Sequence, residues 1–90
     1  MHEITQQVRE FVIANFLFGQ DDGKLQDHQS LLESGIIDST GVLELVTFLE
    51  ERFSIGVADR ELLPENLDSI QSVARFVSRK LEATSRAAAV

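Results

Sequence analysis

Ser39 is the residue of this chain whose type and position are best suited to chemistry. It stands where a loop meets a predicted acidic amphipathic helix, four residues after Gly35 and directly after Asp38. A hydroxyl at such a helix start, with flexible chain before it, is a place where another enzyme can attach a group. The free N–H groups and the dipole at a helix N-terminus also favour negative charge.

A catalytic role for Ser39 is not supported by the rest of the sequence. A serine nucleophile needs a neighbouring base that a third group holds in place. The only histidines are His2, at the chain start, and His28, in a long polar connection. We expect both to be exposed bystanders. The sequence therefore predicts that Ser39 is acted upon and that the protein is not an enzyme.

Ser39 or Asp38 could also have a purely structural role as the cap of the helix. Such a cap contributes about 1 kcal/mol to helix stability. The structural role and the modification role are compatible if Asp38 provides the cap and leaves the hydroxyl of Ser39 free.

The elements that must position this serine are all predicted to be helical. Apolar spacing predicts main helices over residues 3–17 and 39–53 and a third from Asp68 or Ser69 onward. Residues 59–63 predict one short helical turn closed by Pro64, because proline disfavours helical angles in the residue before it. Asp68, with Gln71 three residues on, predicts a capping-box-like start for the last helix. The fold class is therefore an all-α bundle of three main helices plus one short helical turn.

The residues expected to be buried recur at helical spacing. They are Ile4, Val8, Phe11, Val12 and Phe16; Val42, Leu45, Val46, Leu49 and Phe53; and Ile70, Val73, Ala74, Val77 and Leu81. We expect Leu25, Leu31 and Leu32 to fix the long connection before Asp38 onto the helices, because a free connection of that length is uncommon in a compact domain. The folded domain is expected to span residues 1–83, with residues 84–90 as a frayed tail.

Composition limits the classes of partner. The chain has 90 residues, a net charge of −7 and no cysteine. Residues 31–68 contain nine acids and two arginines, so the net charge of this middle segment is as large as that of the whole chain. Nucleic acid and anionic membrane need cationic partners, so we expect neither to bind. There is no apolar run long enough to span a membrane and no signal-peptide pattern at the start, and we expect a cytoplasmic monomer.

The segment around Ser39 resembles the modification site of the acyl carrier proteins. In that family a Gly-x-x-Asp-Ser-Leu stretch opens the second helix, and the serine carries 4′-phosphopantetheine. The matching run here is Gly35-Ile36-Ile37-Asp38-Ser39-Thr40, and the helix that follows is similar too. The resemblance covers roughly residues 4–81. It implies that Ser39, with Asp38 beside it, binds 4′-phosphopantetheine, whose thiol holds an acyl or aminoacyl group as a thioester.

The resemblance also implies a set of partners. A phosphopantetheinyl transferase would attach the group, a ligase or transferase would load an acyl or aminoacyl group, and downstream acyl-using enzymes would receive it. The second helix would be the docking face. Its expected contact residues, together with one acid of the preceding loop, are Glu33, Thr40, Val42, Leu43, Glu44, Glu50 and Glu51. Such rim charges set the rate and orientation of encounter more than affinity.

Three functional hypotheses remain open from the sequence. The first is an acyl carrier in fatty-acid, polyketide or related synthesis, and the second is an aminoacyl or peptidyl carrier loaded by an adenylating ligase. The third is an unmodified helical interaction module. Thr40 stands where the family usually has leucine and Gly41 follows it, which weakens the first helical turn and favours a specialised carrier at least as much as a housekeeping one.

A metal site is not expected. Asp21-Asp22-Gly23 bears a slight likeness to a calcium loop. With Gly23 in the sixth position, however, the first, third and twelfth positions would be Phe18, Gln20 and Gln29, which do not supply the required carboxylates.

Overall fold

The computed structural model describes residues 2–17 and 25–89, and it describes side chains for residues 3–17 and 25–83. Within these ranges the chain forms four α-helices and one 3₁₀ helix, without a strand. The helices are α1 (His2–Phe16), α2 (Ser39–Phe53), η1 (Asp59–Glu61), α3 (Pro64–Leu67) and α4 (Ile70–Ala89). The all-α bundle with three main helices is confirmed.

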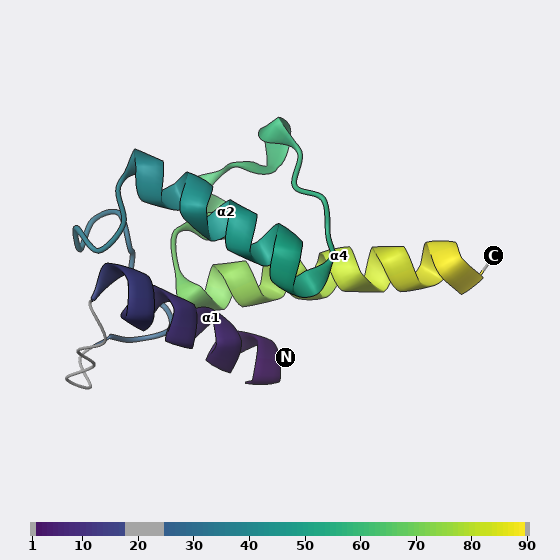
Figure 1. Cartoon of the computed structure of the whole chain (residues 1–90), viewed down its shortest axis with the longest axis horizontal. Coiled ribbons are helices and arrows are strands. Elements are labelled where there is room, and N and C mark those ends of the chain that lie inside the picture. The colour runs from purple at the N-terminus through teal and green to yellow at the C-terminus, as the bar shows by residue number, and fades with distance from the viewer. Residues whose placement is uncertain (1, 18–24, 90) are drawn as a thin grey trace.

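Helix α4 is the element against which the other α-helices pack. It contacts α1, α2 and α3, and its last turns extend beyond the ends of α1 and α2 (Figure 1). The backbone of α4 remains helical through Ala89. The division of the chain at residue 83 stays a prediction.

The core is built from the apolar stripes of the helices and from a few residues of the connections. Its buried members are Val8, Val12, Leu25, Leu31, Ile37, Leu45, Val46, Leu49, Ile55, Leu67, Ile70, Val73, Ala74, Phe76 and Val77. Phe11 of α1 stacks on Phe48 of α2, with ring centroids 4.1 Å apart, and so joins these two helices. Burying each large apolar side chain contributes roughly 1.5–3 kcal/mol before conformational entropy is subtracted.

The long connection before α2 is fixed to the core, as the sequence indicated, but by two of the three expected leucines. Leu25 and Leu31 are buried. The prediction for Leu32 was wrong, because its side chain is 40% exposed. Leu32 instead contributes its backbone N–H, which donates to the carboxylate of Asp68 at 2.9 Å.

The start of α4 differs from the predicted capping box. The cap is Ser69, whose hydroxyl oxygen accepts the N–H of Ser72 at 3.1 Å. The carboxylate of Asp68 is turned away from the helix and binds Ser30 and Leu32 instead. Pro64 does more than close the preceding turn, because it is the first residue of the additional short helix α3. A proline suits that position, since its missing N–H would have no partner there.

Candidate functional site

Ser39 is the first residue of α2, and its side chain is exposed. Asp38 before it has an extended backbone, and its Oδ1 atom accepts the N–H of Gly41 at 2.7 Å. Asp38 is therefore the helix cap. Within the described ranges the Ser39 hydroxyl has no hydrogen-bond partner, so it faces solvent without a competing structural task.

A tight turn precedes Asp38 and Ser39 and places both residues at the surface. The carbonyl of Leu31 accepts the N–H groups of Ile36 and Ile37 at 3.0 and 3.1 Å. Gly35 closes this turn with φ +73°, a left-handed conformation that side chains other than glycine rarely adopt. Ile37 is 3% exposed and anchors the turn in the core. The next two residues are consequently held at the surface at the start of α2.

A shallow hollow of about 320 Å³ lies beside the serine, between the end of α1 and the start of α2. It is lined by Asn15, Phe16, Gly35, Ile36, Asp38, Thr40, Gly41 and Glu44. The contribution of α1 was not foreseen from the sequence. A glycine in the first turn of α2 was the available signal, because an isolated glycine in a helix often marks a close approach.

The expected docking residues are mostly exposed. Thr40, Leu43, Glu44 and Glu51 lie on one face of α2 by their helical spacing, and all four are exposed. Leu43 is 57% exposed, which makes it the most exposed of the large apolar side chains whose exposure is described. Glu33 is exposed on the preceding turn. Val42 is half-buried against the core, so Leu43 is the apolar residue that this face leaves free.

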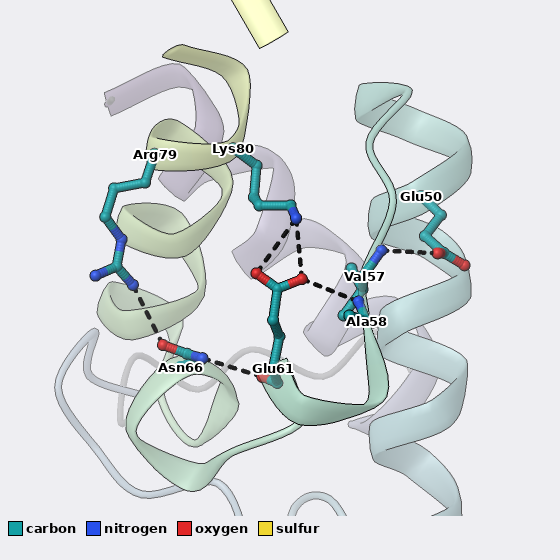
Figure 2. Close-up of polar contacts among 7 residues, drawn as sticks. All are labelled: Glu50, Val57, Ala58, Glu61, Asn66, Arg79 and Lys80. Carbon is teal, nitrogen blue, oxygen red and sulfur yellow. Dashed lines mark hydrogen bonds and ion pairs between the residues drawn. The ribbon is translucent and has the colours of Figure 1, made fainter. Parts of the chain in front are cut away.

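Glu50 lies at the edge of that face and has a structural contact. Its Oε2 atom accepts the N–H of Val57 at 3.0 Å, which ties α2 to the segment that follows it. In Figure 2, Glu50 reaches Val57 on one side of the η1 segment, and Lys80 of α4 reaches Glu61 on the other. Of the predicted docking acids, Glu50 is therefore already engaged within the molecule.

Glu61 is the centre of the second contact. Its carboxylate accepts the N–H of Ala58 at 2.9 Å and receives Lys80 Nζ at 2.9 and 3.2 Å. The hydrogen bond from Ala58, followed by that from Lys80, lowers the pKa of Glu61 below its ordinary value of 4.5. This pair fixes η1 against α4. Its role is therefore structural.

Groups that could activate Ser39 are not found in the described structure. His28 is exposed in the loop. The side chain of His2 and residues 21–23, where the calcium-loop likeness falls, lie outside the described residues. Among the residues that are described, no group of three or more His, Asp or Glu side chains could hold a metal ion. None of the described helices is long and apolar enough to cross a membrane.

The structure thus has an exposed serine at a capped helix start on a small helical bundle. Comparison with known proteins identifies the class of protein. Residues 16–77 match the family model described as the phosphopantetheine attachment site. A probable acyl carrier protein, PigG of Serratia sp. (strain ATCC 39006), is 32% identical over 68 residues, 76% of this chain and 77% of that protein.

Two further relatives extend the comparison. The acyl carrier protein of Buchnera aphidicola subsp. Baizongia pistaciae is 32% identical over 79 residues, 88% of this chain and 96% of that protein. The D-alanyl carrier protein of Streptococcus suis is 35% identical over 57 residues, 63% of this chain and 71% of that protein. The chain belongs to the acyl carrier protein family.

Membership of the family defines the class of function. The protein is a carrier that moves acyl groups on a covalently attached 4′-phosphopantetheine, and it is not an enzyme. The attached group supplies the thiol that holds an acyl group as a thioester, a function that a chain without cysteine cannot supply itself. Carriers of this family interact with transferases and with acyl-using enzymes.

Proposed function

We propose that Ser39 is the residue that carries 4′-phosphopantetheine. The observation that supports this assignment is that different residues cap α2 and present an exposed hydroxyl at its start. Asp38 caps the helix through Gly41 N–H, and the hydroxyl of Ser39 stays exposed and unbonded among the described residues. The position also suits the product, since the N-terminal end of α2 favours the negative charge of a phosphodiester.

The attachment is a group transfer in which this chain is the acceptor. Ser39 Oγ attacks the phosphorus of coenzyme A that bears the pantetheine arm, and a new O–P bond forms. The P–O bond to the other phosphate breaks, which releases adenosine 3′,5′-bisphosphate. We assign removal of the hydroxyl proton to a base of the transferase, because the adjacent carboxylate, Asp38, is engaged in capping α2.

The exposed face of α2 is our proposed docking surface for the phosphopantetheinyl transferase and the later enzymes. Glu44 and Glu51 supply negative charge there, and Leu43 supplies an apolar contact on the same face. Thr40 and Glu33 extend the surface towards the preceding turn. Exposed charges of this kind act mainly on encounter rate and orientation, which suits a carrier that must also dissociate.

The load belongs to one of two classes. An acyl group of fatty-acid, polyketide or related synthesis is our first candidate, and two of the relatives are named as acyl carrier proteins. An aminoacyl group attached by an adenylating ligase is the second, and it is favoured by the similarity to a D-alanyl carrier protein. Loading assays with purified ligases and their substrates separate the two. The family match favours a carrier of either class of load over an unmodified helical interaction module. We place the carrier in the cytoplasm as a monomer.

The assignment is tested by incubating the purified protein with coenzyme A, magnesium and a promiscuous phosphopantetheinyl transferase. Intact mass spectrometry should show the gain of one phosphopantetheine group on the wild type. Ser39→Ala should abolish the gain while the circular dichroism spectrum stays unchanged. Ser34→Ala removes a neighbouring exposed hydroxyl outside the proposed docking residues and should leave the mass gain intact. Modification of Ser39→Ala, or a wild type that gains no mass, would overturn the assignment.

A further inference from the structure

Asp68, at the junction of α3 and α4, binds the turn that leads to Ser39. Its Oδ2 atom accepts the hydroxyl of Ser30 at 2.6 Å, and its Oδ1 atom accepts the N–H of Leu32 at 2.9 Å. Its backbone carbonyl accepts the N–H of Leu31 at 2.7 Å. One residue therefore holds three consecutive positions of a segment that lies 36 to 38 residues away in the sequence.

The held segment is continuous with the site by a short series of hydrogen bonds. Ser30 Oγ also accepts the N–H of Glu33 at 3.1 Å, which closes the first part of the turn. The carbonyl of Leu31 accepts the N–H groups of Ile36 and Ile37, which closes the second part. Ile37 precedes Asp38, the cap of α2. Asp68 is thus connected to Ser39 by hydrogen bonds within the turn and by the covalent backbone from Ile37 to Ser39.

Local sequence does not explain why an aspartate occupies position 68. The cap of α4 is supplied by Ser69, so Asp68 is not needed for that helix. Among the described residues its carboxylate bonds to the Ser30 turn alone, and the residue is half-buried. A half-buried side chain with two hydrogen bonds to one turn fixes the position of that turn, because its polar atoms are costly to leave without these partners.

We propose that Asp68 is a positioning residue for the modification of Ser39. It fixes the turn of residues 30–37 to the α3–α4 junction, and so holds the start of α2 in the arrangement that the transferase binds. The proposal rests on the assignment of Ser39 as the attachment residue. Asp68 does not touch the reacting atoms and acts only through the turn.

The expected kinetic signature follows from this indirect role. A loosened turn occupies several arrangements, and the apparent affinity falls in proportion to the competent fraction. Once the transferase has bound the competent arrangement, the chemical step is unchanged. Loss of the Asp68 contacts should therefore raise KM for the carrier and leave kcat nearly constant.

The test compares four variants under conditions in which circular dichroism shows each to be fully folded. Asp68→Ala removes both side-chain contacts. Asp68→Asn keeps an acceptor for Leu32 N–H and a donor for Ser30 Oγ, and should rescue the function. Asp59→Ala removes the same charge from an exposed residue whose side chain has no contact among those described. Val12→Ala weakens the core without removing a hydrogen bond of the turn.

For Asp68→Ala we expect KM to rise about tenfold with kcat within about twofold of wild type, as expected for a reduced competent fraction. The other three variants should stay within about threefold of the wild-type KM, a range set by the same relation. Amide hydrogen exchange at Leu31, Ile36 and Ile37 should accelerate in Asp68→Ala and not in Val12→Ala.

The proposal is overturned if Asp68→Ala has the KM of Asp59→Ala, or if Asp68→Asn is as impaired as Asp68→Ala, since charge alone would then be responsible. An equal rise of KM in Val12→Ala would also overturn it, because general destabilisation would suffice. Failure of the Ser39 assignment is distinguishable, because the wild type itself would then gain no phosphopantetheine, and the positioning role would fall with it.

Discussion

Gly41 of α2 lies directly against Phe16 of α1. A methyl group added at Gly41 would stand 3.0 Å from Cε1 of Phe16, 3.1 Å from Cγ2 of Ile37 and 3.3 Å from Oδ1 of Asp38. The glycine that weakens the first turn of α2 in isolation is therefore what lets the end of α1 approach the start of α2. The walls of the hollow beside Ser39 depend on this close approach.

The first prediction concerns Gly41→Ala. Helix propensity alone would stabilise the protein by about 1 kcal/mol, whereas overpacking a confined site costs about 1–3 kcal/mol. Ile37 is buried and Asp38 is fixed by its capping bond, so neither can easily move away. We expect a net destabilisation of about 1 kcal/mol in urea unfolding, since the overpacking cost exceeds the propensity gain.

A double-mutant cycle checks the cause of that cost. In a Phe16→Leu background the closest atom is removed, and Gly41→Ala should be less harmful by at least about 0.5 kcal/mol. If Gly41→Ala stabilises the protein that retains Phe16, the ring yields without penalty and the explanation from close packing is wrong.

The second prediction concerns the cap of α2. Asp38→Ala removes the acceptor of Gly41 N–H and should lower the free energy of unfolding by about 1 kcal/mol. Asp38→Ser retains a capping oxygen and should lower the free energy of unfolding by only about 0.3 kcal/mol. Chemical denaturation at neutral pH measures both. Equal losses in the two variants would mean that the charge of Asp38, and not its hydrogen bond, stabilises the helix.

Helix α2 and the cap at Asp38 show how much could be predicted from the sequence. The predicted bounds of α2 agree with the observed Ser39–Phe53, because an aspartate before a strongly periodic segment defines a helix start locally. Asp68 has the same type of local context, and there the prediction failed. A carboxylate before a helix can cap it or bind a distant turn, and only the folded chain brings Ser30 within reach of Asp68.

Elsewhere in the fold, too, features set by local sequence were predictable and features set by distant contacts were not. The buried stripes of the main helices follow from periodicity, which depends on neighbours in the sequence. Exposure of Leu32 and the contact between Gly41 and Phe16 depend on how segments far apart in the chain meet. For the site, position and exposure of Ser39 were accessible from its local context, whereas the contribution of α1 to its surroundings was not.

The third prediction is a pH dependence of stability from Glu61. Its pKa is lowered in the folded protein, first by the Ala58 N–H and then by Lys80. The ionised carboxylate therefore stabilises the fold above its ordinary pKa of 4.5, and this stabilisation is lost as the pH falls through the lower folded-state value. We expect Glu61→Gln to be less stable than wild type by about 1 kcal/mol at pH 7, as for loss of one charged hydrogen-bonded contact.

The difference between wild type and Glu61→Gln should shrink as the pH falls below 4.5. Thermal melts at several pH values measure it. Glu82→Gln, which changes an exposed glutamate of α4, is the matched control and should follow the wild-type curve. A constant difference between wild type and Glu61→Gln across this range would contradict the role given to the ionised pair with Lys80.

The fourth prediction concerns the proposed docking face. Glu44 is exposed on α2 one turn after Ser39, and it lines the hollow beside the serine. Reversing its charge should slow encounter with a basic transferase surface. We expect Glu44→Lys to raise KM for modification about tenfold at low salt, with little change in kcat, because rim charges act mainly on association.

Two controls test the prediction for Glu44→Lys: a change of salt concentration and the same charge reversal at another position. The effect of Glu44→Lys should shrink strongly near 1 M salt, where the Debye length is only about 3 Å. Glu82→Lys makes the same charge change on α4, away from the proposed face, and should leave KM within about twofold of wild type at all salt concentrations, as expected for a charge outside the encounter surface. Equal effects of the two reversals would mean that net charge, and not the face of α2, guides the encounter. An effect of Glu44→Lys that persists in high salt would point instead to a direct packed contact at that residue.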